Sequence, residues 1–146
     1  MNRLRGPRRA ISGFSLVELL AVIAIVGILG ALAISSYRNN VMQANRTDAI
    51  RAMTSWRQSL ERCYSQNYTY VGCSAIPATL PTPSPSAYYL ISFPTLAAST
   101  YQIVATPAGG QANDLTCASF QVTNTGAQAA QTSAAADSTR TCWGSN

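Results

Sequence analysis

The residue with the strongest chemical signal in this sequence is a carboxylate inside an apolar segment. Glu18 is the only charged residue between Gly13 and Ile34, in a stretch that is long and hydrophobic enough to enter a membrane. Because a carboxylate in lipid is costly unless it is paired, such a residue is expected to be functional and to have a defined partner. Cleavage after Gly13 would create a positively charged amino terminus at Phe14, four residues before Glu18.

Other residue types that commonly perform chemistry are scarce. The chain has no histidine, so the commonest general base and metal ligand is missing. Nucleophile-elbow motifs, glycine-rich phosphate loops and paired carboxylates are also absent. Asp114 and Asp137 are interpreted as turn residues. We therefore expect the protein not to be an enzyme and to bind no cofactor.

Positive charge is concentrated on the N-terminal side of the apolar segment. Sixteen uncharged residues run from Leu19 to Ile34, and about 20 helical residues span a hydrocarbon core of ~30 Å. Four of the ten arginines precede Gly13, which predicts a cytoplasmic amino terminus and an exported remainder. The alternative is a cleavable secretory signal ending at residues 31–33. Against it, the apolar stretch exceeds the usual ~7–15 residues and contains a carboxylate.

The residues GFSLVE, from Gly13 to Glu18, resemble the prepilin cleavage motif of type IV pilins and the related pseudopilins. The resemblance implies that a prepilin peptidase cleaves between Gly13 and Phe14 and methylates Phe14. It further implies that Glu18 is needed for assembly into a helical fibre of packed N-terminal helices. The sequence differs from many pilins at Ser35, where they have a helix-kinking proline.

Beyond Ile34 the pattern becomes that of an amphipathic helix. Apolar residues recur at steps of four and three, which defines one helical face: Ala49, Met53, Trp56, Leu60 and Cys63. The opposite face is predicted to be polar: Arg46, Arg51, Ser55, Gln58 and Arg62. Arg57 and Glu61 have the spacing of a surface pair. Residues 61–70, ERCYSQNYTY, resemble the helix end of PilE-like minor pilins.

The rest of the chain predicts a small sheet. Residues 87–93, 100–106 and 117–123 are aromatic and β-branched and are predicted as strands. Residues 72–87 contain four prolines and are predicted as loop, with neither strand nor helix. The tract from 126 to 139 is low in complexity and is expected to hold at most one short edge strand.

These elements predict an α+β protein with the pilin fold. A long N-terminal helix spans the membrane with its first half, and a small antiparallel sheet packs on its second half. The expected organisation is a leader (1–13), a transmembrane and assembly helix (14–36), an amphipathic helix (37–66), an αβ-loop (67–87), and the sheet with a C-terminal disulfide loop (88–146).

The four cysteines of this short, exported chain indicate two disulfides, with three possible connectivities. Cys63–Cys73 with Cys117–Cys142 is preferred because both bonds close local loops. The second also resembles the C-terminal disulfide loop of pilins. Zinc binding is the alternative, but the chain has neither histidine nor a Cys-x-x-Cys pair, so we expect no metal.

The leading hypothesis is a minor pilin, a structural subunit that helps to initiate or join a type IV pilus used in motility, adhesion and surface attachment. The expected partners are other pilin subunits, the prepilin peptidase, the inner membrane and the assembly machinery. Before assembly the protein would cross the inner membrane once, with its C-terminal part in the periplasm. Afterwards it would reach the cell surface in the pilus.

Three alternatives stay open. A type II secretion pseudopilin is disfavoured by the two disulfides, the proline-rich loop and the few acidic residues. A DNA-uptake receptor would need clustered cations, yet residues 67–146 contain only Arg140 beside two aspartates. We therefore do not expect nucleic acid as a partner unless several subunits combine their cations. A secreted protein with a conventional signal would be recognised by its mature N-terminus.

Overall fold

The computed structural model describes residues 15–144. One long helix, α1 (Leu16–Asn67), precedes a five-stranded sheet, and two short helical elements accompany the sheet. The chain divides into two compact units, residues 1–39 and 40–146. We call the second unit the head, and the two units are described separately.

In the first unit, α1 presents apolar side chains around its whole circumference. Twelve large apolar residues between positions 16 and 34 are exposed by 47% to 72%. Within the described residues, α1 is the one helix that is long and apolar enough to cross a membrane, and its most apolar window has a mean hydropathy of 2.7. A helix that is hydrophobic on all sides needs lipid or other helices around it.

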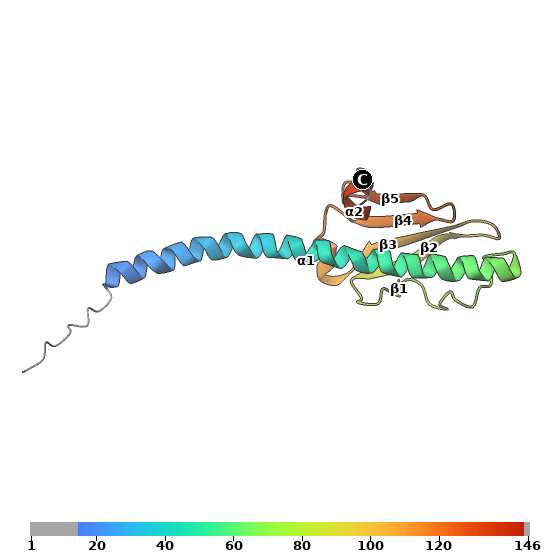
Figure 1. Cartoon of the computed structure of the whole chain (residues 1–146), viewed down its shortest axis with the longest axis horizontal. Coiled ribbons are helices and arrows are strands. Elements are labelled where there is room, and N and C mark those ends of the chain that lie inside the picture. Colours follow the sequence, from blue (N-terminus) through green and yellow to red (C-terminus); the bar gives the residue numbers. More distant parts are fainter. Residues whose placement is uncertain (1–14, 145–146) are drawn as a thin grey trace, which may run out of the picture. The chain divides into compact units, whose positions relative to one another are not determined.

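In the head, one face of α1 packs on one face of the sheet (Figure 1). The helix contributes small and apolar side chains that are at most 3% exposed: Ala49, Ala52, Met53 and Leu60. Trp56 and Cys63 are partly buried against the same core. The 3.6-residue period of these positions therefore predicted the packed face correctly.

The sheet is entirely antiparallel, in the order β1-β2-β3-β4-β5. The strands are β1 (Thr82–Pro83), β2 (Tyr89–Leu96), β3 (Tyr101–Pro107), β4 (Ser119–Thr123) and β5 (Gln128–Gln131). Side chains alternate between the two faces of the pleat. The inner set is fully buried and meets α1: Tyr89, Ile91, Tyr101, Ile103, Ala105, Phe120, Val122 and Ala130.

Two prolines lie within strands where the sequence predicted a loop or a strand end. Pro83 belongs to β1, inside the stretch predicted as loop only, and pairs with Leu90. This is possible because β1 is an edge strand, where a missing N–H costs no ladder bond. Pro94 follows residues 87–93, the first stretch predicted as a strand, and was expected to end it. Instead β2 continues to Leu96 across a register shift between Ser92 and Thr95, where a bulge accommodates the proline.

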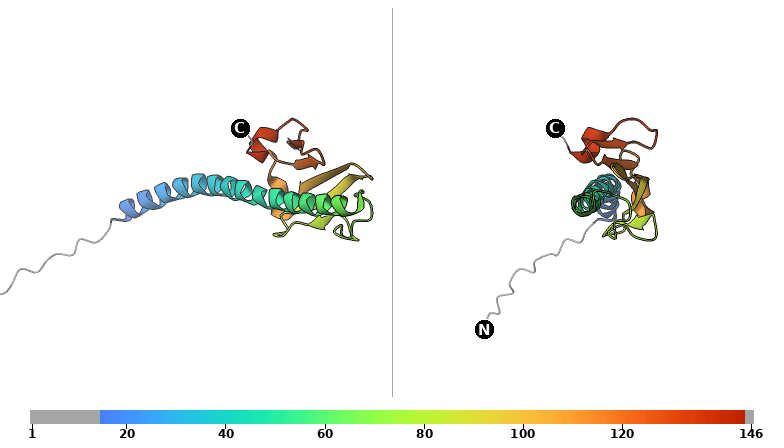
Figure 2. Two further views of the ribbon diagram at one scale, coloured as in Figure 1. Left: turned by 45° about the vertical axis from the view of Figure 1, so that its right-hand side comes forward. Right: turned by 90° about the vertical axis from the view of Figure 1, so that its right-hand side faces the viewer.

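The C-terminal half contains two helical elements that were not predicted. A 3₁₀ helix, η1 (Gly109–Asn113), follows β3, and α2 (Thr139–Trp143) follows the low-complexity tract. β5 is the short edge strand expected in that tract. Its edge is capped where Gln131 bridges to Asp137, which protects the strand from pairing with another chain. Figure 2 shows α2 and the β4–β5 region side by side in both views.

Candidate assembly segment and polar contacts of the head

The candidate assembly segment contains, in its first helical turn, the carboxylate singled out in the sequence. Glu18 lies in the first turn of α1 and is exposed, and Val17 and Leu19 beside it are exposed by 72% and 58%. A negative charge at a helix N-terminus is favoured by the helix dipole. Such a carboxylate can accept a positively charged partner from outside the chain. Gly13 and Phe14 lie outside the described residues.

Two disulfides join segments of the head, in the pairing preferred from the sequence. Cys63–Cys73 ties the end of α1 to the loop that follows it. Cys117–Cys142 ties the segment just before β4 to α2. All four cysteines are thereby used, and no free cysteine exists in the chain. Within the described residues no cluster of histidine, cysteine or acidic side chains could hold a metal.

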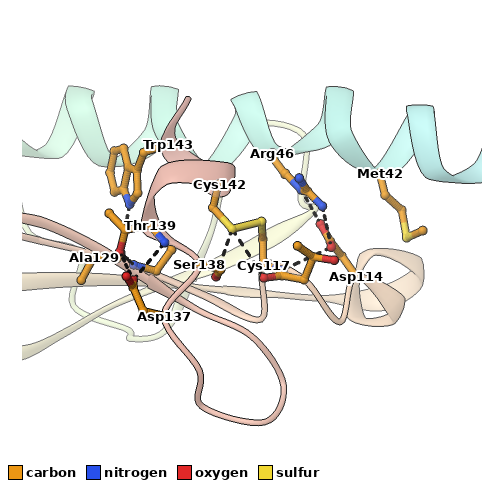
Figure 3. The surroundings of a disulfide bond; sticks show 12 residues. Met42, Arg46, Asp114, Cys117, Ala129, Asp137, Ser138, Thr139, Cys142 and Trp143 are labelled. Carbon is orange, nitrogen blue, oxygen red and sulfur yellow. Dashed lines mark hydrogen bonds and ion pairs between the residues drawn. A yellow bond between two sulfur atoms is a disulfide. The ribbon is translucent and has the colours of Figure 1, made fainter. Parts of the chain in front are cut away.

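The C-terminal disulfide lies beside a buried ion pair that links α1 to the segment after η1 (Figure 3). Arg46 donates from Nε and Nη2 to the two carboxylate oxygens of Asp114, at 2.7 Å and 2.9 Å. The two side chains are only 11% and 3% exposed. Asp114 also accepts from the backbone N–H of Cys117. The pair is therefore bidentate and mostly desolvated, the geometry in which arginine and carboxylate interact most strongly.

This finding corrects one prediction and extends another. Arg46 was placed on the polar, outward face of the helix, but its side chain is mostly buried. Asp114 was interpreted as a turn residue, and its carboxylate does accept from the N–H of Cys117 three residues on, but it also holds Arg46. The helical period could not reveal the pair because its partners are 68 residues apart in the chain. Each side chain is buried only because the other supplies its counter-charge.

Gln111 extends the ion pair into a small network that sequence reasoning missed. Its side-chain Nε2 donates to the carbonyl oxygen of Met42, to the hydroxyl of Tyr89 and to Asp114. Its Oε1 accepts from Asn45. The network fixes one turn of α1, residues 42–46, to η1 and β2. A glutamine in a glycine-rich loop gives no sequence signal for such a role.

A second polar cluster surrounds Glu61. Its carboxylate accepts from the hydroxyl of Tyr101 at 2.8 Å and from that of Tyr70 at 3.1 Å. Burial, followed by the hydrogen bond to Glu61, raises the pKa of Tyr101 to about 12. Within the described residues Arg57 forms no ion pair with Glu61, contrary to the expected surface pair. Its guanidinium lies instead near Gly126 in the β4–β5 turn.

Comparison with known proteins places the chain in a family. Residues 35–121 match the family model described as type IV minor pilin ComP, DNA uptake sequence receptor. The chain belongs to the type IV minor pilin family. Residues 8–34 match the prokaryotic N-terminal methylation motif, a range that includes Gly13, Phe14 and Glu18. The leading hypothesis from the sequence is thereby confirmed at the level of the family, whose members are structural subunits of pili.

Individual relatives of this pilin match over shorter stretches. It is 32% identical over 76 residues to prepilin peptidase-dependent protein D of Escherichia coli, covering 52% of each chain. It is 33% identical over 67 residues to a probable minor fimbrial protein of Dichelobacter nodosus, covering 46% of this chain and 42% of the relative. The matched segments thus span about half the length of these relatives.

A solved type IV pilin from Shewanella oneidensis is 28% identical, with a TM-score of 0.45. The match covers 60% of this chain and 89% of the Shewanella pilin.

Proposed function

We propose that this minor pilin is cleaved between Gly13 and Phe14, methylated at Phe14, and anchored by the apolar part of α1 with its head exported to the periplasm. It then joins a pilus through packing of this helical segment against other pilin subunits. The observation that carries the proposal is the uniform exposure of the apolar side chains from Leu16 to Ile34. A head that already buries its own core leaves this segment to lipid or to neighbouring helices.

Glu18 would set the position of the subunit within the fibre. Its exposed carboxylate stands among apolar residues and would pair with the amino group of Phe14 on a neighbouring subunit. The attraction between the two charges strengthens as the surroundings become less polar. The subunit would therefore dock on its neighbour at the axial offset that brings these two charges together. At other offsets the carboxylate would stay unpaired in an apolar environment, which is costly.

The test compares Glu18→Val and Glu18→Asp with the wild type in cells that express the other pilins. We expect Glu18→Val to be inserted, disulfide-bonded and stable, yet absent from sheared fibres. Glu18→Asp should be intermediate because its charge remains but its reach is shorter. Arg51→Gln, an exposed substitution in the head, is the control and should be incorporated normally. Equal incorporation of Glu18→Val would refute the role in assembly. A mature N-terminus near Ser35 would refute the processing step.

A second candidate function follows from the description of the matching family, which names a DNA uptake sequence receptor. The charge of the head supports it only weakly. Residues 40–146 contain five arginines and four acidic residues, a net charge of +1, and Arg46 is already neutralised by Asp114. Binding to phosphates depends on several cations acting together. An electrophoretic mobility shift with duplex DNA at low and moderate salt tests this candidate, and salt-resistant binding by the single subunit would establish it.

A further inference from the structure

A polar pocket lies where the end of α1 meets the loop closed by the Cys63–Cys73 disulfide. Its volume is about 270 Å³, slightly below the ~300 Å³ at which small-molecule sites begin. The lining side chains carry hydroxyl, carboxamide and guanidinium groups: Ser59, Arg62, Gln66, Asn67 and Ser74. The lining contains no carboxylate. Such a set offers many donors and acceptors and a single positive charge.

Four of these five polar side chains are not used in holding the fold together. Among the described residues, Ser59, Arg62, Gln66 and Ser74 make no side-chain hydrogen bond, whereas Asn67 uses its amide nitrogen to bond the carbonyl oxygen of Cys63. The disulfide fixes the helix and the loop relative to each other. The two walls of the pocket are therefore held in place before any ligand arrives, which lowers the entropy cost of binding.

Tyr68 follows the lining residue Asn67 and has no evident role in stability. It ends α1 in the left-handed conformation, with φ of 57°, at the position that helices usually give to glycine. A side chain there costs about 1–2 kcal/mol, and the tyrosine regains little by packing because it is 82% exposed. A residue that is both strained and exposed is a candidate for a function outside the fold.

We propose that this pocket binds a single sugar ring that carries a carboxylate, such as a hexuronic acid unit. Arg62 would bind the carboxylate with two parallel hydrogen bonds, and the amides and hydroxyls would bind the sugar hydroxyl groups. Tyr68 does not line the pocket; it follows the lining residue Asn67, and its exposed ring would have to turn toward the pocket to cover the apolar face of the sugar. A nucleic acid strand fits less well, because a single arginine cannot neutralise successive phosphates, whereas it can pair with one carboxylate.

The experiment uses the full mature protein in detergent and measures binding of D-glucuronic acid, D-glucose and a short oligodeoxynucleotide by calorimetry and ligand-observed NMR. We expect D-glucuronic acid to bind and D-glucose to bind more weakly. Arg62→Gln should weaken the binding of D-glucuronic acid by about tenfold or more, since a hydrogen bond to a charged group is lost. Its control is Arg51→Gln, which removes an exposed arginine of the same helix outside the pocket and should change nothing.

Tyr68→Gly separates binding from folding. Glycine relieves the strained backbone, so the variant should unfold at the same or a higher temperature than the wild type while binding the sugar acid more weakly. Its control is Tyr88→Ala, which removes another exposed tyrosine. The proposal is overturned if D-glucuronic acid does not bind, if D-glucose binds equally well, if Arg51→Gln has the same effect as Arg62→Gln, or if the oligonucleotide binds more tightly through Arg62. None of these outcomes bears on assembly, which depends on Glu18.

Discussion

Removing the carboxylate of Asp114 is expected to destabilise the head more than any exposed charge substitution. In Asp114→Ala the guanidinium of Arg46, with a side chain only 11% exposed, loses both of its hydrogen bonds and its counter-charge. An uncompensated buried charge of this kind costs about 3–5 kcal/mol. The backbone N–H of Cys117 also loses its acceptor. We do not add a separate cost for this lost bond, because the same carboxylate is removed. We therefore expect a decrease of about 4 kcal/mol in the free energy of unfolding, a large part of the ~5–15 kcal/mol typical of a domain.

The measurement is denaturant unfolding of the full chain in detergent with its disulfides intact, followed by tryptophan fluorescence. Both tryptophans, Trp56 and Trp143, lie in the head. The double variant Arg46→Met, Asp114→Leu removes both charges and should recover most of the loss, because a well-packed apolar pair often replaces a buried ion pair without penalty. Arg51→Ala is the control and should stay within about 0.5 kcal/mol of wild type.

Two results would refute this reasoning. A cost below about 1 kcal/mol for Asp114→Ala would mean that the pair behaves like an exposed one. A double variant as unstable as Asp114→Ala would mean that the lost hydrogen bonds, and not the unpaired charge of Arg46, account for the effect.

Three further predictions concern other parts of the head. The pKa of Tyr101 rises from 10.0 to about 12 on folding, so its stabilising contribution is complete below pH 10 and is lost as the pH rises through 12. In Tyr101→Phe the free energy of unfolding should therefore fall less steeply with pH in this range. The same pH dependence as in the wild type would contradict the prediction. Cys117 and Cys142 close a loop of 25 residues. Replacing both by alanine should lower the free energy of unfolding by about 3.5 kcal/mol, because the unfolded chain gains entropy. Non-reducing peptide mapping should find a peptide that links the two cysteines, and free thiols at both positions would exclude the bond. Gly126 has φ of +84° and leaves 3.4 Å between an added Cβ and Arg57, so Gly126→Ala should lower the unfolding free energy by about 1–2 kcal/mol, whereas Gly110→Ala, which meets nothing within 4 Å, should have a much smaller effect.

Local patterns in the sequence determined the main elements of this pilin. The apolar run and the absence of proline between Arg8 and Pro77 predicted one long helix, and it extends over Leu16–Asn67. Ala49, Met53 and Leu60 were assigned to the packed face by their spacing and are fully buried. Each of these features depends on neighbouring residues within a few turns, so the 3.6-residue period is enough to find it. The cysteine pairs were likewise preferred because they close short loops.

Contacts between distant segments were decided by the tertiary structure alone. Arg46 looks like a surface residue in the helical period, but Asp114 reaches it from the loop after η1 and makes its burial possible. Glu61 has Arg57 one turn away, yet it accepts hydrogen bonds from Tyr101 and Tyr70. In both places a charged group is held by partners that only the folded chain brings near. Arg46 is desolvated only once the folded head covers it, and an unpaired charge there would be costly. Glu61 remains exposed, and its partners are set by where the sheet places the two tyrosine hydroxyls.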